Sequence, residues 1–316
     1  MFDRSKPSIE GLDDTFMIKL NKKLQKKKIL SCLVLRNEKL VFEYYKNKKN
    51  ENKLQRINSC TKSFISALFG ILIKQGLIKD LHTPIVEFFP NLINKQSDIR
   101  KKEITLYNLL TMTPGFYWPE FGKWDNFPKM QYSSDMIKFI INRPLESSPG
   151  EYMNYNSGCS HLLSAIIQKV SRVSTYDFSR KYLFRPLGIN NSFWYDRDNI
   201  NLGADGLKIQ SKDMLKFGYL YLKKGFLNGK EIIPKKWVEK STDIHFKGYD
   251  NIGDYGYHWW ISKGKEYYFS LGYGGQFIIV SPKYNLVAVF TSRMYENSLV
   301  PLKYFNEYIL PSLRVN

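Results

Sequence analysis

The chain has 316 residues, 43% of them hydrophobic and 16% aromatic, which is enough for one large globular unit with a well-filled core. Its longest mostly apolar run, residues 64–73, is too short to span a bilayer, and the polar start at residues 1–6 lacks the apolar segment of a secretory signal. We therefore expect a single domain over residues 1–316, located in the cytoplasm and without a membrane span.

The formal net charge of +19 raises the question of a nucleic-acid partner. The excess is mostly lysine and is spread along the whole chain, with its densest run at residues 22–28. This distribution is typical of solvated helix faces, so we expect no specific nucleic-acid binding. Attraction of an anionic surface or substrate is compatible with the same charge.

The expected elements, in chain order, are a helix over 9–27, strands over 29–35 and 40–45, a helix from Ser59 to about Gly76, helices over 162–170 and 212–223 within a mostly helical stretch, strands over 257–262, 267–271, 277–281 and 286–291, and a helix over 299–310. Strands from both chain ends thus bracket a helical middle. This order predicts an α+β fold in which residues 1–76 and 246–316 build one antiparallel sheet flanked by helices, with residues 77–245 inserted as a mostly helical part.

The residue types that bind metals show no metal-site spacing. The three cysteines are widely separated and form no Cys-x-x-Cys pair, and the four histidines form no His-Glu-x-x-His motif. We expect no metal, no cofactor and no disulfide framework.

Ser59 and Lys62 open the apolar helix that follows the first two strands. Positions i and i+3 share one face of a helix, so the Ser59 hydroxyl can meet the Lys62 amine. At a helix N-terminus, free backbone N–H groups and the helix dipole also favour a developing negative charge. A nucleophile, a base and half of an oxyanion hole are therefore close together in the sequence, which predicts a serine hydrolase.

The spacing alone is weak evidence, because it recurs at Ser262 and Lys265 without a helical pattern. A helix-start serine beside a solvated lysine is the structural alternative. Two further segments decide between these interpretations: Pro149 to Gly158, which leads into a helix, and Leu271 to Phe277, which leads into an apolar strand.

With Ser59-x-x-Lys62, these two segments come in the order and context of the three boxes of the serine β-lactamase and penicillin-binding-protein superfamily. The chain resembles its class C-like branch, which includes esterases and 6-aminohexanoate-dimer hydrolases, from about Lys28 to Arg293. The resemblance implies a β-lactamase/transpeptidase-like fold.

The resemblance also implies catalytic roles. Ser59 would form an acyl-enzyme, and Lys62, with an ammonium pKa lowered by desolvation and by neighbouring positive charge, would accept or relay the proton. Tyr155 corresponds to the tyrosine of the second box, which shuttles protons, although a buried core tyrosine is the structural alternative. The family register assigns the other oxyanion N–H to Gln276.

The remaining expectations concern substrate binding. Gly274 and Gly275 would let the backbone approach a ligand closely, or would form a glycine bulge. Tyr273 stands where many β-lactamases and DD-peptidases carry Lys or His, and Ser157 stands where Asn is common. Both departures favour the esterase and amide-hydrolase members of the family.

Aromatic residues after the turn at Pro114-Gly115, above all Trp118 and also Trp124, would wall the cleft or pack in the core. Arg293 could meet a substrate carboxylate or simply lie on the surface.

We expect a serine hydrolase that cleaves a small ester or amide. A penicillin-binding DD-peptidase or weak β-lactamase is the nearest alternative, and a non-catalytic ligand-binding relative is the alternative of another class. The sequence does not specify the oligomeric state.

Overall fold

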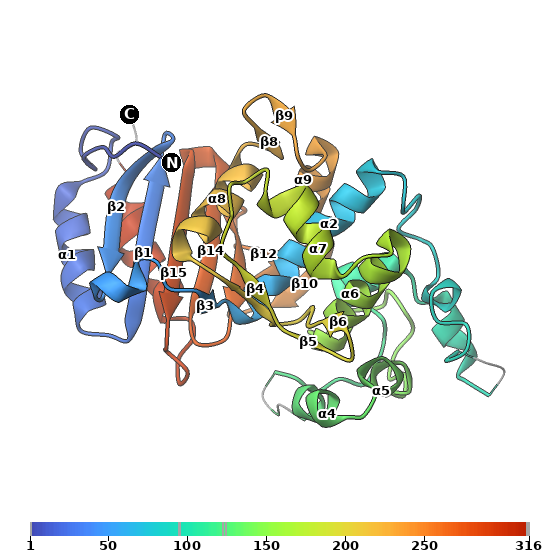
Figure 1. Ribbon diagram of the computed structural model, residues 1–316. Coiled ribbons are helices and arrows are strands. Elements are labelled where there is room, and N and C mark those ends of the chain that lie inside the picture. The colour runs from blue at the N-terminus through green and yellow to red at the C-terminus, as the bar shows by residue number, and fades with distance from the viewer. Residues whose placement is uncertain (1, 94–95, 122, 124, 314–316) are drawn as a thin grey trace.

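The computed structural model describes residues 2–93, 96–121, 123 and 125–313 (Figure 1). Within these ranges, the main sheet has eight antiparallel strands in the order β10-β11-β12-β13-β14-β15-β1-β2. Its strands are β1 (Ile29–Arg36), β2 (Lys39–Tyr45), β10 (Phe246–Tyr249), β11 (Gly253–Tyr255), β12 (Trp260–Ile261), β13 (Tyr268–Gly272), β14 (Gln276–Ser281) and β15 (Leu286–Ser292). The chain therefore builds one sheet from its two ends.

Short strands form three small sheets beside the main one: β3 (Gln55–Arg56) with β7 (Leu207–Ile209) and β4 (Phe193–Trp194), β5 (Asp196–Arg197) with β6 (Ile200–Asn201), and β8 (Phe226–Leu227) with β9 (Lys230–Glu231). The α-helices are α1 (Asp14–Gln25), α2 (Thr61–Lys74), α3 (Leu106–Thr111), α4 (Asn126–Tyr132), α5 (Met136–Ile141), α6 (Ser157–Ser171), α7 (Thr175–Ser179), α8 (Ser211–Leu222), α9 (Lys235–Ser241) and α10 (Val300–Tyr304). Most of these helices lie between β2 and β10 in the chain (Figure 1).

The central strands are apolar on both faces, and alternate residues enter two separate cores. Leu33 of β1 and Val289 of β15 pack toward α2, α6 and α8, whereas Val34 and Ala288 pack toward α1 and the C-terminal helical segment. The sheet is thus the middle layer of three, as an α+β sheet covered on both faces requires.

Helix α2 is the buried axis of the helical side. Every residue from Thr61 to Leu72 is buried, and the helix contacts α6, α9 and β13. Because it begins at the end of the sheet and runs into the helical part, its N-terminus lies where the two parts meet (Figure 1).

The structure confirms the expected antiparallel sheet, the helix after Ser59 and the helices near 162–170 and 212–223. The strand expected at 257–262 is shortened to Trp260–Ile261, because His258 has a left-handed backbone with φ of 59°. Sequence analysis also missed β10 and β11. Both strands are short, and each contains a glycine, Gly248 in β10 and Gly253 in β11. No helix within the described residues is both long and apolar enough to cross a membrane.

Gly218 brings helix α8 into close contact with the sheet. A Cβ at this position would lie 2.6 Å from Val287 Cγ1 and 2.9 Å from Ile278 Cγ2. We expect Gly218→Ala to destabilise the protein by about 1–3 kcal/mol in urea unfolding, although alanine is the better helix former. Lys22→Ala, at an exposed position of α1, is the control and should change stability little. A Gly218→Ala variant as stable as the wild type would contradict this packing.

Candidate active site

Ser59 lies in a single 3-10 turn, Asn58–Cys60, that leads directly into α2. Asn58 adopts a left-handed backbone with φ of 49°, which asparagine tolerates better than most residues. Its side-chain amide donates to the carbonyl of Tyr273 at 2.7 Å. This contact fastens the turn that carries Ser59 to the hairpin between β13 and β14.

Lys62 is 2% exposed and points at the serine. Its Nζ donates to Ser59 Oγ at 2.9 Å and to the carbonyl of Ala204, also at 2.9 Å. Burial lowers the pKa of Lys62 to about 8, because the charged ammonium loses its hydration. The amine is therefore available as a base near neutral pH.

The charged neighbours of Lys62 differ from our expectation. Instead of positive charges, the carboxylates of Glu120 and Asp205 lie nearby, and they raise the pKa of the ammonium. Desolvation alone thus accounts for the low value, and the acidic neighbours limit the decrease.

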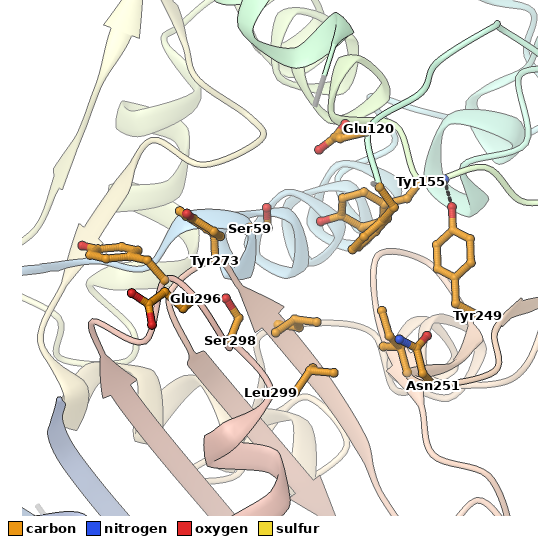
Figure 2. Close-up of a pocket in the computed structure, with 13 residues that line it drawn as sticks. Ser59, Glu120, Tyr155, Tyr249, Asn251, Tyr273, Glu296, Ser298 and Leu299 are labelled. Atoms are coloured by element: carbon orange, nitrogen blue, oxygen red, sulfur yellow. Dashed lines mark hydrogen bonds between the residues drawn. The ribbon is translucent and has the colours of Figure 1, made fainter. Parts of the chain in front are cut away.

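Tyr155 completes the group around Ser59. Figure 2 shows its phenol pointing toward Ser59, and Lys62 Nζ lies 5.0 Å from the centre of its ring. Burial raises the pKa of the phenol well above its usual value, whereas a hydrogen bond with Ser59 lowers it. The phenol is consequently protonated at neutral pH and can donate a proton. Its position is fixed by stacking on Trp260, with ring centres 5.8 Å apart.

Glu120 is a site residue that sequence analysis missed. It is 3% exposed, and its Oε2 accepts from the indole of Trp118 and from the backbone N–H of Ser157, both at 2.7 Å. Its Oε1 accepts from the Ser157 hydroxyl at 2.6 Å. The sequence signal that could have revealed Glu120 is its position inside the aromatic run 116–121. A carboxylate buried among apolar residues needs several hydrogen-bond donors, and such a cluster of donors indicates a site.

Trp118 and Ser157 therefore lie beneath the site rather than in the cavity. Both are almost fully buried, and both donate to Glu120. Trp124 lies outside the described residues. Arg293 is exposed, away from Ser59, in a neighbouring depression.

The third box forms the tight turn between β13 and β14. Gly274 and Gly275 have φ of 78° and 83°, which is the left-handed region that glycine adopts without strain. Tyr273 lines the cavity together with Ser59. Gln276 does not line it: its side chain is buried and donates to the Ser292 carbonyl at 2.7 Å, and its own carbonyl faces the thiol of Cys60.

A cavity of about 530 Å³ opens above Ser59. Apolar and aromatic side chains dominate its wall, and its ionisable carboxylates are Glu120 and Glu296. The lining residues are Ser59, Glu120, Phe121, Tyr155, Tyr249, Asn251, Ile252, Leu271, Tyr273, Tyr295, Glu296, Ser298 and Leu299 (Figure 2). Tyr249, which sequence analysis also missed, accepts from the backbone N–H of Tyr155 at 3.1 Å.

A Ser-Lys pair at the junction of an antiparallel sheet and an inserted helical part is the arrangement of the serine β-lactamases and penicillin-binding proteins. The sequence profile of the Beta-lactamase family matches residues 22–306, and the chain belongs to this family of hydrolases.

Three relatives illustrate the similarity. A 6-aminohexanoate-dimer hydrolase from Paenarthrobacter ureafaciens is 22% identical over 278 residues, covering 81% of this chain and 70% of the relative. A candidate 6-aminohexanoate-dimer hydrolase from Bacillus anthracis has a TM-score of 0.79 at 22% identity, over 92% of this chain and 80% of that one. A class C β-lactamase from Rhodobacter sphaeroides has a TM-score of 0.72 at 15% identity, over 95% of this chain and 100% of that one.

The buried ammonium of Lys62 should reduce the stability of the fold. Its pKa is about 8 in the folded protein against 10.5 when exposed, so the unfolded chain binds more protons between these pH values and stability rises with pH across that window. Lys62→Met removes the penalty but forfeits two hydrogen bonds. We expect a net stabilisation of about 1–2 kcal/mol at pH 7, which shrinks toward pH 10.

Urea unfolding at pH 7 and pH 10 measures this difference, with exposed Lys79→Met as the control. A Lys62→Met protein that is less stable at pH 7, or whose advantage grows with pH, would show that Lys62 is not held by burial as described.

Proposed function

We propose that the protein, acting as one unit over residues 1–316, is a metal-independent serine hydrolase that cleaves a small ester or amide through an acyl-enzyme on Ser59. The observation that carries the proposal is the 2.9 Å contact between Lys62 Nζ and Ser59 Oγ, made by a lysine whose pKa is about 8. A base of this strength is suited to deprotonate a serine hydroxyl near neutral pH.

In the acylation step, Ser59 Oγ attacks the substrate carbonyl carbon while Lys62 takes the hydroxyl proton. The tetrahedral intermediate then collapses, the bond to the leaving group breaks, and that group receives a proton from the Tyr155 phenol. The proton held by Lys62 then passes to the Tyr155 phenolate, so that both groups return to their starting states. In deacylation, the same pair takes a proton from a water molecule that attacks the acyl carbonyl carbon, and it returns this proton to Ser59 Oγ as the bond from that carbon to Oγ breaks and the acid leaves.

The oxyanion of the intermediate needs two N–H donors. The N–H of Ser59, at the start of α2, is one candidate. For the second, we retain the donor that the family register indicates, the main-chain N–H of Gln276, which begins β14 directly after the turn that carries Tyr273 to the cavity wall. Burial of the Gln276 side chain does not affect this assignment, because the donor belongs to the main chain.

The lining supports an ester or amide over a β-lactam or D-Ala-D-Ala peptide. The β-lactamases and DD-peptidases often bind a substrate carboxylate through a cation of the third box, where this chain has Tyr273. No Lys or Arg is among the described residues that line the cavity. The described part of the wall thus offers no full positive charge to a carboxylate placed beside Ser59.

We expect a fluorophosphonate probe to label Ser59 and the wild type to hydrolyse p-nitrophenyl butyrate. Ser59→Ala should abolish both, and Lys62→Ala and Tyr155→Phe should each slow turnover about a hundredfold or more. Cys60→Ala is the matched control, because burial raises the pKa of this adjacent thiol to about 12 and removes it as a nucleophile. Intact and peptide mass spectrometry locate the adduct.

Turnover that survives Ser59→Ala would refute the proposal. A folded wild type without turnover or adduct would favour the non-catalytic ligand-binding relative, and turnover of nitrocefin in place of esters would favour a β-lactamase.

The pH dependence of kcat/KM reports the pKa of the catalytic base in the free enzyme. We expect a rising limb with an apparent pKa near 8, because Lys62 must be neutral in the free enzyme. Glu120 raises the pKa of Lys62, so Glu120→Gln should move the limb to lower pH even where it reduces the rate. Glu103→Gln, at an exposed position of the helical part, should leave the limb in place. A limb that moves to higher pH in Glu120→Gln would contradict this electrostatic role.

A further inference from the structure

A second hollow, here called the basic depression, adjoins the catalytic cavity. It encloses about 350 Å³, and of the eight described residues that line it, five are cationic: Lys26, Lys27, Lys28, Lys46 and Arg293. The other three are Met294, Tyr295 and Glu296, of which the last two also line the cavity above Ser59. The two hollows therefore share one wall.

The sheet topology brings these cations together. Lys28 directly precedes β1, Lys46 follows β2, and Arg293 follows β15, which pairs with β1 on its other side. Because these strands are antiparallel, the ends of β2 and β15 meet the start of β1. The backbone N–H of Arg293 donates to the carbonyl of Lys28 at 2.8 Å, and that of Lys46 donates to the carbonyl of Leu30 at 2.9 Å.

The third box of the proposed catalytic site, at the turn before Gln276, lies at the same end of these strands. Gln276, the first residue of β14, accepts from the N–H of Ser292 at the end of β15 at 3.2 Å. The hydroxyl of Ser292 donates to the carbonyls of Gly274 and Gly275. The strand ends that carry the cations are thus rigidly connected to the turn that faces Ser59.

The shared wall is itself fixed to that turn. The N–H of Met294 donates to the carbonyl of Gly274 at 2.8 Å, and the rings of Tyr273 and Tyr295 lie 5.3 Å apart. A Cβ on Gly274 would lie only 2.8 Å from Cε1 of Tyr295. The wall that the two hollows share is therefore held in place against the turn that carries Tyr273.

The cations of the depression form no ion pair with any carboxylate among the described residues. Within the part of the chain that the structure describes, no carboxylate lies within 4.0 Å of the amines of Lys26, Lys27, Lys28 and Lys46 or of the Arg293 guanidinium. Lys46 Nζ instead donates to the carbonyls of Gln25 and Lys27. Among the described residues that line the depression, Glu296 is the one acidic residue. Five like charges around one hollow repel one another unless an anion joins them.

We propose that the basic depression binds an anionic group, a phosphate or a carboxylate, of the substrate whose scissile carbonyl lies at Ser59. The substrate class is then an amphiphilic ester or amide, with an apolar portion against Phe121, Ile252 and Leu299 and the anion beyond Tyr295. This inference rests on the proposed hydrolase activity, and its test is arranged so that the two can fail separately.

The activity test compares anionic esters with neutral esters of equal length. One series consists of mono-p-nitrophenyl esters of succinic, adipic and sebacic acids against their methyl diesters, and the other of butyrate esters of a phosphorylated phenol against the unphosphorylated phenol. The readout is the ratio of kcat/KM for the anionic over the neutral ester. We expect the wild type to prefer an anionic ester, and the series that shows the preference identifies carboxylate or phosphate.

The triple variant Lys28→Gln/Lys46→Gln/Arg293→Gln should lower this ratio about tenfold, because each exposed pair is worth a few fold. Glu296→Gln should raise it about two- to fivefold. The matched control, Lys79→Gln/Lys230→Gln/Lys236→Gln, removes the same charge from exposed positions outside both hollows and should leave the ratio within twofold. No anionic preference in the wild type, or an equal loss in the control, would overturn the proposal.

Binding of the same esters to the Ser59→Ala protein, measured by calorimetry, separates the two proposals. Tighter binding of an anionic ester that the Lys28/Lys46/Arg293 substitutions abolish supports the basic depression even if the wild type does not hydrolyse esters. Equal binding of anionic and neutral esters overturns the basic depression and leaves the hydrolase proposal standing on its own test.

Discussion

The site depends on the burial of one ammonium group beside one hydroxyl. Lys62 lies on the first turn of a helix that is buried from Thr61 to Leu72, so its amine has almost no access to water. Burial makes it a base with a pKa of about 8, and the carbonyl of Ala204 and the hydroxyl of Ser59 fix its direction. The same burial is unfavourable for folding, so the packing around α2 must offset it.

The packing around α2 is possible because the helix begins at the ends of the strands of the main sheet, where the sheet and the helical part meet. The turn holding Ser59 is fastened to the β13–β14 hairpin through Asn58, and the helical part supplies Tyr155, Glu120 and the carbonyl of Ala204 from the other side. Neither part contains a complete site. The geometry of the proposed site is thus a property of the junction, and residues of both parts pack into each of the two cores.

The sequence patterns predicted those features that depend on residues close together in the chain. The spacing of Ser59 and Lys62 places them together on any helix, and the apolar runs predicted the strands of the central sheet. The contacts of Glu120 and Tyr249 join segments far apart in the sequence, and no periodicity reports such contacts. The third-box motif located the turn that carries Tyr273 to the cavity wall, whereas the contact of the Gln276 side chain with Ser292 joins two strands and could not be read from the motif.

Positive and negative charges are distributed unevenly around the site, although the chain as a whole is strongly basic. The charged groups that act on Lys62 are the carboxylates of Glu120 and Asp205, which keep its pKa near 8 rather than lower and so allow the amine to hold a proton briefly and return it. A cation in their place would lower that pKa further and weaken the base. Positive charge is instead placed across the Tyr295 wall, where it remains hydrated and can attract an anion without disturbing Lys62. The wall at Tyr295 and Glu296 thus separates the cations of the basic depression from the cavity above Ser59, while burial holds the pKa of Lys62 near 8.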